Sequence, residues 1–472
     1  MSALADRLRD VPGRLAALAR EFRVPGASLA VMAGDEVFAT ACGVLNTATG
    51  VEATPDSVFQ MGSITKVWTT TLVMQLVDEG KLDLDAPVVE MLPEFGLADA
   101  QASRAITLRH LLTHTSGIDG DQFVDTGRGD DAIARFVAYL HGVGCIHAPG
   151  KRFSYCNAGF VVAGRLVEVL RGASYDAVLR EHIVRPLGLR ATGTLPEQAI
   201  LHRAAAGHFA DTDGNPRVVP VWSLQHSNAP AGATPFTTAT EALIFAGMHI
   251  DDGAAPLPHG EPQASGESHR ARGRVLSQSS ARAMRQRHFE VRGSAGSMAD
   301  AWGLGWMLKD GGGGALVCHS GVTIGQRAWL DVLPESRVAL ALLTNGGDAN
   351  ALASRLRTAL LCEVAGFTLP PLPAIDETSP VEAARHLGVY ERSGARIEVI
   401  PCGAGIGVRI RAIWFSMAPD PAILPLRPIG GDRFRVTLPD SADDTIVGFA
   451  DADAPGGARF LEIQGRAHPR VG

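Results

Sequence analysis

The chain has 472 residues, of which 46% are hydrophobic and 20% charged, so it is long enough for about two or three domains and apolar enough to bury a large core. Its 43 basic and 50 acidic residues give a net charge of −7. That balance excludes a strongly basic surface of the kind that binds nucleic acid or an anionic membrane.

The N-terminal segment, residues 1–22, carries charged residues throughout and leucines at helical spacing, which predicts a helix. It has no uninterrupted apolar stretch of the kind found in a secretory signal. No run in the chain approaches the roughly 18 apolar residues of a membrane-spanning helix. The six cysteines show no CxxC spacing, which favours reduced thiols over a disulfide framework or a zinc site. We therefore expect a cytoplasmic protein.

A hairpin and a long apolar helix follow. Two β-strands are predicted around a glycine-containing turn, at Gly26–Met32 and Glu36–Val44. The helix is predicted from Ser63 to Glu79, with Gly80 ending it. Residues i and i+3 share a helix face, so the Lys66 amine can lie beside the Ser63 hydroxyl. The pair is either a nucleophile with its base or a serine cap followed by a surface lysine.

Residues 83–178 have the pattern of helices and loops, including a helix at Ala158–Leu170. The sequence Tyr155-Cys156-Asn157 lies immediately before that helix, and no other of the four tyrosines has asparagine two residues on. A loop aromatic and a helix cap would explain the same residues. His110 and His114 are four residues apart, which favours packing on a helix over metal binding, because no acid or third ligand accompanies them.

Strands return late in the chain. They are predicted at Ala301–Leu308, Leu316–His319, Gln326–Leu333 and Val338–Thr344, with a helix after them to about Val364. Early and late strands with helices between them predict an α+β domain whose sheet is made by both ends of that region. His319-Ser320-Gly321 ends one of these strands. Its HxG pattern recurs at His386, but that copy opens the C-terminal module.

Two stretches have no apolar period. Residues 251–273 are rich in glycine, proline and histidine, and we expect disorder there, with a functional lid as the alternative. Residues 368–380 are proline-rich and form a predicted linker. The linker separates a domain at 1–367 from a module at 381–472, in which short β-like runs alternate with turn residues. That alternation predicts a small antiparallel barrel or sandwich.

The motifs SxxK at Ser63, YxN at Tyr155 and HxG at His319 occur in the order that resembles the serine β-lactamase and penicillin-binding-protein family, nearest its class C-like and DD-peptidase-like branch. The resemblance covers about Val24 to Ala365. It implies an antiparallel sheet flanked by helices, together with a helical subdomain. For the C-terminal module at 381–472 we expect a small antiparallel β-barrel of lipocalin-like form.

By this resemblance, Ser63 is the acylated nucleophile and Lys66 its base. Tyr155 would pass a proton to the leaving group and take one from the incoming nucleophile. Asn157 would hydrogen-bond either the Lys66 amine or a substrate amide. The backbone N–H groups of Ser63 and Val322 would form an oxyanion hole, which is worth roughly 3 to 4 kcal/mol per donor in comparable sites. The resemblance implies no metal and no other cofactor.

His319 is a catalytic candidate that stands where many relatives have lysine. Histidine titrates near 6.5, so this side chain should be mostly neutral at cytoplasmic pH and poorly suited to hold a free substrate carboxylate. Together with the missing secretory signal, this points away from β-lactam or peptidoglycan chemistry. Some peptidases and esterases of the family also carry histidine here.

The length, the motif positions and the C-terminal module look like those of the penicillin-binding-protein-type thioesterases, stand-alone cyclases of nonribosomal peptide assembly. This resemblance implies that a linear peptide, typically with a D-residue at its acylating end, moves from a carrier-protein thioester to Ser63 and leaves as a head-to-tail lactam. Alternatives are a cytoplasmic hydrolase of the same fold, such as a D-stereospecific peptidase, an esterase or a β-lactamase-like enzyme, and a non-catalytic ligand-binding homologue. We expect a monomer that contacts the peptide and, transiently, the carrier protein.

Four further residues are weaker candidates for substrate contact. Gly232 falls where relatives line the substrate cleft, and its lack of a side chain would leave space for substrate. Arg466, near the chain end, either reaches the site from the C-terminal module or is a solvated surface residue. Gly321 and Trp306 belong to stretches that carry the resemblance.

Overall fold

The computed structural model describes residues 3–255, 273–291, 298–379, 381–412, 421–439 and 444–472. Most of the segment predicted as disordered, residues 256–272, lies outside the described residues. No helix in the described ranges is both long enough and apolar enough to cross a membrane. All six cysteines are described, and all are free thiols, as predicted.

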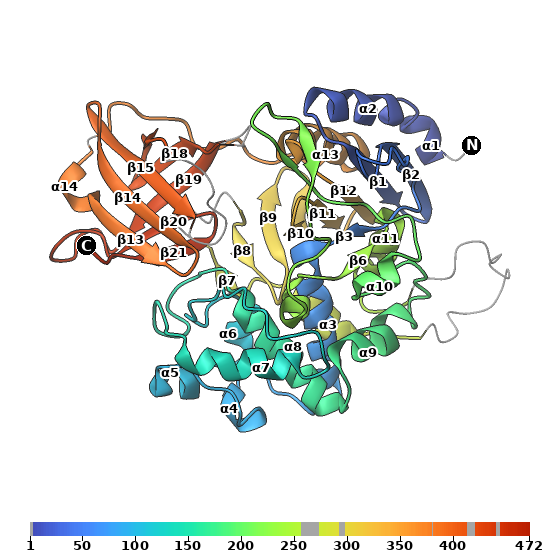
Figure 1. Ribbon diagram of the computed structural model, residues 1–472, viewed down its shortest axis with the longest axis horizontal. Coiled ribbons are helices and arrows are strands. Elements are labelled where there is room, and N and C mark those ends of the chain that lie inside the picture. Colours follow the sequence, from blue (N-terminus) through green and yellow to red (C-terminus); the bar gives the residue numbers. More distant parts are fainter. Residues whose placement is uncertain (1–2, 256–272, 292–297, 380, 413–420, 440–443) are drawn as a thin grey trace.

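Eight antiparallel strands form the central sheet, in the order β2-β1-β12-β11-β10-β9-β8-β7 (Figure 1). The strands are β1 (Gly26–Ala33), β2 (Glu36–Gly43), β7 (Phe289–Glu290), β8 (Ala301–Trp302), β9 (Met307–Gly311), β10 (Gly314–Val322), β11 (Arg327–Leu333) and β12 (Val338–Thr344). β1 pairs with β12, Ala27 lying opposite Thr344. Both ends of the predicted α+β region therefore meet in one sheet, as predicted.

Helices cover both faces of this sheet, and the alternation of side chains along β12 sorts the two layers. Leu340 and Leu342 pack with α1 (Ala3–Arg7), α2 (Val11–Glu21) and α13 (Ala349–Ala365). Ala341 and Leu343 pack on the opposite face, in the core that includes α3 (Thr65–Asp78) and α11 (Ala239–Ile250). Because both faces are covered, every residue of β12 is buried.

A helical subdomain packs against α3 and holds the YxN motif. Its elements are α4 (Val88–Met91), α5 (Ala100–Ala105), α6 (Leu108–Leu112), α7 (Ala132–Tyr139), η2 (Leu140–Gly142), α8 (Asn157–Arg171), α9 (Tyr175–Leu179) and η3 (Arg180–Val184). In the chain, α10 (Pro196–Ala199), the pair β4 (His208–Ala210) with β5 (Pro216–Val218), η4 (His226–Ala231) and β6 (Phe236–Thr237) come between this subdomain and α11. β6 pairs with β3 (Phe59–Gln60), which precedes the long helix α3. After α11, α12 (Gln278–Met284) leads back to the sheet.

The C-terminal module consists of antiparallel strands, as predicted. A four-stranded sheet holds β13 (Gly388–Arg392), β14 (Ala395–Cys402), β15 (Gly405–Ala412) and β16 (Leu424–Pro425), after the short helix α14 (Ala383–His386). A five-stranded sheet holds β17 (Arg427–Gly430), β18 (Arg433–Thr437), β19 (Asp444–Ala450), β20 (Phe460–Ile463) and β21 (Arg466–Pro469). A bridge between Tyr390 and Arg470 joins them. The described strand pairs thus form two antiparallel sheets that this bridge joins, and a closed barrel stays a prediction.

Candidate active site

Ser63 lies in a turn of 3-10 helix, η1 (Gly62–Ile64), from which α3 continues. The Thr65 hydroxyl donates to the Gly62 carbonyl at 2.7 Å and fixes this turn. One turn later, Lys66 Nζ lies 2.9 Å from Ser63 Oγ and donates to the Ala231 carbonyl at 2.6 Å. The sequence spacing therefore does bring the serine and the lysine into direct contact.

Lys66 is completely buried. Burial, followed by repulsion from the Arg466 guanidinium, lowers the pKa of Lys66 well below its usual value, while Asp121 opposes this shift in part. A lysine with a depressed pKa has a neutral amine available at moderate pH. Lys66 is therefore suited to take the proton from Ser63.

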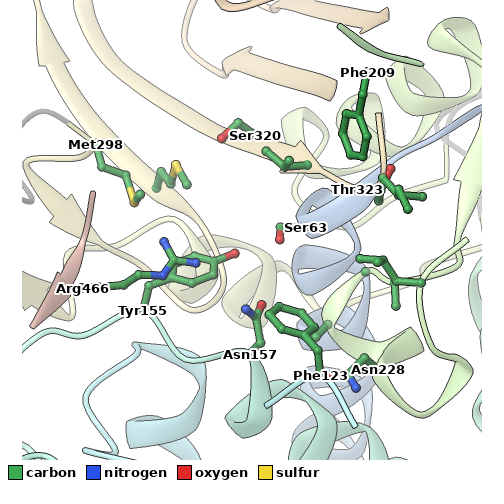
Figure 2. A pocket seen from close by; sticks show the side chains of 17 residues that line it. Ser63, Phe123, Tyr155, Asn157, Phe209, Asn228, Met298, Ser320, Thr323 and Arg466 are labelled. Atoms are coloured by element: carbon green, nitrogen blue, oxygen red, sulfur yellow. The ribbon is translucent and has the colours of Figure 1, made fainter. Parts of the chain in front are cut away.

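Tyr155 stands on the other side of the serine, in the loop before α8. Its hydroxyl hydrogen-bonds Ser63, and its ring centroid lies 4.9 Å from Lys66 Nζ. Figure 2 shows the hydroxyl pointing toward Ser63. Burial raises the pKa of Tyr155, so the phenol is protonated at rest. The tyrosine is thus a proton donor and the lysine a proton acceptor, with the nucleophile between them.

His114 forms the wall behind Tyr155, a role that the sequence does not predict. The two rings stack with centroids 4.1 Å apart and planes at 26°. His114 Nδ1 accepts the backbone N–H of Cys156 at 2.9 Å, and Trp302 packs edge-on against the imidazole at 4.8 Å. Burial lowers the pKa of His114 well below 6.5, so a neutral ring supports the tyrosine. The backbone φ of His114 is +58°, a value that is uncommon for residues other than glycine and that marks a constrained position.

His110, which lies four residues before His114, caps a helix. His110 Nδ1 accepts the backbone N–H of Thr107 at 3.2 Å, and the Thr107 hydroxyl accepts the backbone N–H of His110 in return. Within the described ranges, no group of three or more histidine, cysteine, aspartate or glutamate residues is placed to hold a metal ion.

Asn157 begins α8 and lines the cavity beside Ser63. Its amide nitrogen donates to Asp121 at 2.7 Å, which corrects the predicted hydrogen bond to Lys66. The lysine amine is held by Ser63 and by the Ala231 carbonyl instead, so the asparagine is free to face the cavity. Contact with a substrate amide, the other predicted role of Asn157, remains a proposal.

Arg466 reaches the site from β21 of the C-terminal module. Its Nε donates to Asp121 at 2.7 Å, and its guanidinium carbon lies 5.0 Å from the Tyr155 ring centroid (Figure 2). Of the two readings of Arg466, the structure therefore supports the one in which it reaches the site. Arg392 of β13 adds a second ion pair to Asp121 at 3.4 Å.

Asp121 links these groups, and the sequence motifs do not include it. Burial alone would raise the pKa of Asp121, but Arg466 and Arg392 together lower it below its usual value. The carboxylate is therefore charged, and it anchors two arginines of the C-terminal module beside the catalytic loop.

His319 of β10 lies close to Lys66 but behind the cavity surface. Its Nδ1 donates to its neighbour's carbonyl, Ser320 O, at 2.7 Å. Burial, together with the nearby Lys66, lowers the pKa of His319 to about 3. The imidazole is thus neutral, as the sequence predicts, and it provides no cation for a substrate carboxylate.

Three glycines allow the backbone to close tightly around Ser63. A Cβ on Gly62 would lie 2.6 Å from Val322 N. A Cβ on Gly321 would lie 2.0 Å from the Met61 carbonyl oxygen. A Cβ on Gly232 would lie 2.2 Å from the Gly62 carbonyl oxygen. Gly232 and Gly321 thus serve backbone packing that brings the predicted oxyanion donors together. Gly232 also lines the cavity in front of Ser63, so its contact with substrate stays a prediction, but the space that its Cβ would take is occupied by the Gly62 backbone.

Trp306 does not belong to the site, which corrects its prediction as a substrate contact. It is fully buried and packs edge-on against His249, with ring centroids 5.2 Å apart. Its indole serves the core beneath α3 and contacts none of the cavity.

A cavity of about 470 Å³ opens in front of Ser63, within the range of ligand pockets, roughly 300–1,000 Å³. Figure 2 shows its walls. They comprise Phe123, Phe209, Leu224, Met298, Val322 and Ile324 as well as the polar groups Tyr155, Asn157, Asn228, Ser320, Thr323 and Arg466. A mostly apolar cavity that ends at an activated serine, with a base, an acid and two backbone donors, can carry out acyl transfer.

Comparison with known sequences matches residues 13–365 to the family described as Beta-lactamase. Penicillin-binding protein 4 of Amycolatopsis lactamdurans is 44% identical over 384 residues, which cover 81% of this chain and 97% of that protein. The crystal structure of SurE with D-Leu has a TM-score of 0.72 and 27% identity, covering 99% of this chain and 100% of SurE. A D-amino acid amidase from Ochrobactrum anthropi SV3, complexed with D-phenylalanine, shares the fold over 75% of this chain, with a TM-score of 0.59 and 24% identity.

Proposed function

Since the chain belongs to the serine β-lactamase and penicillin-binding-protein family, we propose that it releases a carrier-bound peptide as a macrolactam through an acyl-serine intermediate. Membership of this family supports the coarser statement that the protein is a serine acyltransferase or hydrolase. The finer proposal concerns which group takes the acyl chain from Ser63.

In the acylation step, Ser63 Oγ attacks the thioester carbon while Lys66 Nζ takes the hydroxyl proton. The backbone N–H groups of Ser63 and Val322 stabilise the oxyanion. When the C–S bond breaks, the thiolate takes the Tyr155 proton, and Lys66 passes its own proton on to Tyr155. The carrier thiol leaves, and both proton-carrying groups return to their resting states.

In the release step, the peptide's own amine attacks the ester carbon. Tyr155 accepts a proton from that amine and gives its hydroxyl proton to Ser63 Oγ as the C–O bond breaks. The amide forms and the serine is regenerated. Cyclisation requires that the amine be held near the ester and that water be kept away from it.

The observation that carries this proposal is the C-terminal module. Its Arg466 enters the catalytic cavity beside Tyr155, so the module adds a wall that excludes water from that side. The likeness to SurE extends over 99% of this chain, and therefore includes the module, whereas the amidase fold covers 75%. SurE was solved with D-Leu, which favours a D-residue at the acylating end of the peptide here as well.

The test supplies a short linear peptidyl thioester that ends in D-leucine and weighs the products. A product lighter than the linear acid by one water supports the cyclase, because the peptide's own amine, and not water, then takes the acyl group from the serine. Exclusive linear acid contradicts the cyclase and leaves a hydrolase. The same peptide ending in L-leucine is the control for stereochemistry.

Ser63→Ala tests the acyl-serine itself. We expect turnover to fall by at least about 10⁴-fold, because nucleophile and base act as one unit. Unchanged turnover of the thioester would rule out the serine mechanism, and the melting temperature of the variant checks that its fold is intact.

A further inference from the structure

Exposed apolar side chains gather beside the active-site cavity. Of the eleven large hydrophobic residues that are exposed in the described ranges, five fall within residues 200–221. These five are Ile200, Leu201, Phe209, Val218 and Val221. Ile200 and Leu201 are 77% and 80% exposed, which is unusual for side chains of this size in the absence of a partner. Val218 pairs with His208 and therefore points to the opposite side of the β4–β5 hairpin from Phe209, so we refer to the other four residues as the 200–221 face.

The 200–221 face is continuous with the mouth of the catalytic cavity. Phe209 lines that cavity directly, next to Val322, whose side chain is also half exposed. Ile200 and Val221 line a second cavity of about 550 Å³, and Leu224 lines both cavities. In the view of Figure 1, α10, which immediately precedes Ile200, and the C-terminal strands lie on opposite sides of β10. In Figure 2, Arg466 of the C-terminal module and Phe209 of this face lie on opposite sides of Ser63, and both line the cavity.

The charges on this face are balanced. Residues 200–221 hold two arginines and two aspartates, whereas the whole chain has a net charge of −7. Arg217, paired across the β4–β5 hairpin with Phe209, donates to Asp211 at 2.9 Å. Arg203 donates to the backbone carbonyl of Glu52, and no carboxylate in the described ranges pairs with it. An apolar centre with a few charges at its edge is the composition of a protein-binding surface.

We propose that the 200–221 face is the docking surface for the carrier protein that delivers the acyl chain. This inference rests on the proposed function. The thioester sits at the end of a long flexible arm, so the carrier must dock at the rim of the cavity and not inside it. Leu201 is 80% exposed and lines neither of these two cavities, so an acyl chain held in them does not cover it. A folded partner beside the mouth does.

The test compares two donors of one short peptide ending in D-leucine. In one, the peptide is loaded on the phosphopantetheine arm of a nonribosomal peptide synthetase carrier protein, and in the other it is the N-acetylcysteamine thioester. For Leu201→Asp we expect KM for the carrier-bound donor to rise about tenfold, since the substitution removes an apolar contact and places a charge in the interface. Turnover of the small thioester should stay within twofold of the wild-type value. Arg203→Glu should act in the same direction, more strongly at low salt.

Val169→Asp is the matched control, because Val169 is 43% exposed on α8 and lines none of the cavities around Ser63. It should leave both donors unchanged. An equal loss on both donors for Leu201→Asp, or no loss on either, overturns the docking surface. Wild-type turnover of the small thioester without turnover of the carrier-bound form also overturns it while leaving the proposed reaction intact. If neither donor reacts, the proposed function fails and this inference fails with it.

Discussion

Burial acts in opposite directions on the two proton-carrying groups beside Ser63. It disfavours the charged form of each, so the pKa of Lys66 falls and that of Tyr155 rises. Both groups are therefore driven toward their neutral forms, one as an acceptor and the other as a donor. A single environment thus assigns the base and the acid without any further charged residue in direct contact with the nucleophile.

Arg466, together with burial, should determine the pH above which the enzyme is active, because both lower the pKa of Lys66. Activity requires neutral Lys66 and so rises with pH as this amine loses its proton. Arg466→Met removes a cation that lowers the pKa of Lys66 and leaves Asp121, which raises it. We expect the acid limb of the profile of kcat/KM against pH to move to higher pH. Arg466→Lys, which keeps the charge, should move it less, and an unshifted limb in Arg466→Met would contradict this account.

At this scale the sequence predicts the residues that belong to spaced motifs and misses those that support them. Ser63 and Lys66 lie three positions apart on one helical turn, so their contact follows from local geometry. Asp121 meets Asn157 and Arg466 only through the folding of distant segments, and no local spacing marks it. The stacking of His114 on Tyr155 is likewise a tertiary contact.

At the scale of elements, the catalytic turn depends on backbone segments that touch without side chains between them. Gly62 and Gly232 come from different elements, and each has a positive φ, 53° and 112°. The turn that carries Ser63 is therefore held by its neighbours as much as by its own hydrogen bonds.

Gly232→Ala should disable the enzyme while much of the fold persists. The added Cβ would lie 2.2 Å from the Gly62 carbonyl oxygen and 2.8 Å from Ser63 N, so the oxyanion turn must shift. We expect kcat/KM to fall by about 10²-fold or more, as for misplacements of about 1 Å in other active sites. Gly172→Ala is the matched control, with a φ of 67° and open space around its Cβ. It should cost about 1–2 kcal/mol in unfolding free energy and little activity.

The sequence predicts long regular elements well and short interrupted ones poorly. Val338–Thr344 is found as predicted, because six consecutive apolar residues followed by a threonine, buried on both faces, leave one interpretation. The predicted strand Ala301–Leu308 is instead split into β8 and β9. Gly303 N donates to the Trp306 carbonyl, and Gly305 has a φ of 76°, which together make a turn. In the sequence, Gly303 and Gly305 were the signal that this predicted strand is interrupted.

At the scale of the whole molecule, Asp121 joins the C-terminal module to the catalytic domain. Its carboxylate pairs with Arg466 of β21 and Arg392 of β13, at 2.7 and 3.4 Å. The Arg392 side chain is 1% exposed, so the Asp121 carboxylate is a counter-charge that offsets the cost of burying this cation. The contacts of Asp121 therefore belong both to the wall of the active site and to the attachment of the module, which the ion pair between Arg152 and Glu462 also supports.

Asp121→Asn should weaken this attachment. Removing one partner of a buried ion pair typically costs about 3–5 kcal/mol. The pKa of Asp121 is lowered in the folded protein, so its stabilisation is complete above its unfolded pKa of about 3.9 and is lost as pH falls through the folded pKa. Denaturant unfolding should show a lower midpoint for the variant at pH 7 and a shallower loss of stability below about pH 4. Asp130→Asn, at an exposed position, should match the wild type.

The division into a catalytic region and a β-rich module could be predicted from composition, because the proline-rich segment 368–380 interrupts the apolar patterns. The contacts between the catalytic region and the module could not be predicted in this way. Arg466 is one of 39 arginines, and nothing in its neighbourhood distinguishes a buried ion pair from a solvated side chain. Only the fold places β21 against the loop of Tyr155, whose backbone N–H donates to the Gly465 carbonyl.

The pairing of β1 with β12 also bears on how the protein is made. β1 and β2 emerge early from the ribosome, but the partner for the other edge of β1 ends at Thr344. At roughly 5 to 20 residues per second, this edge waits on the order of tens of seconds. During that time a mostly apolar strand has a free backbone edge, which is a site for aggregation. Nascent chains that end before β12 should therefore aggregate or require a chaperone, whereas chains extended past α13 can complete the sheet.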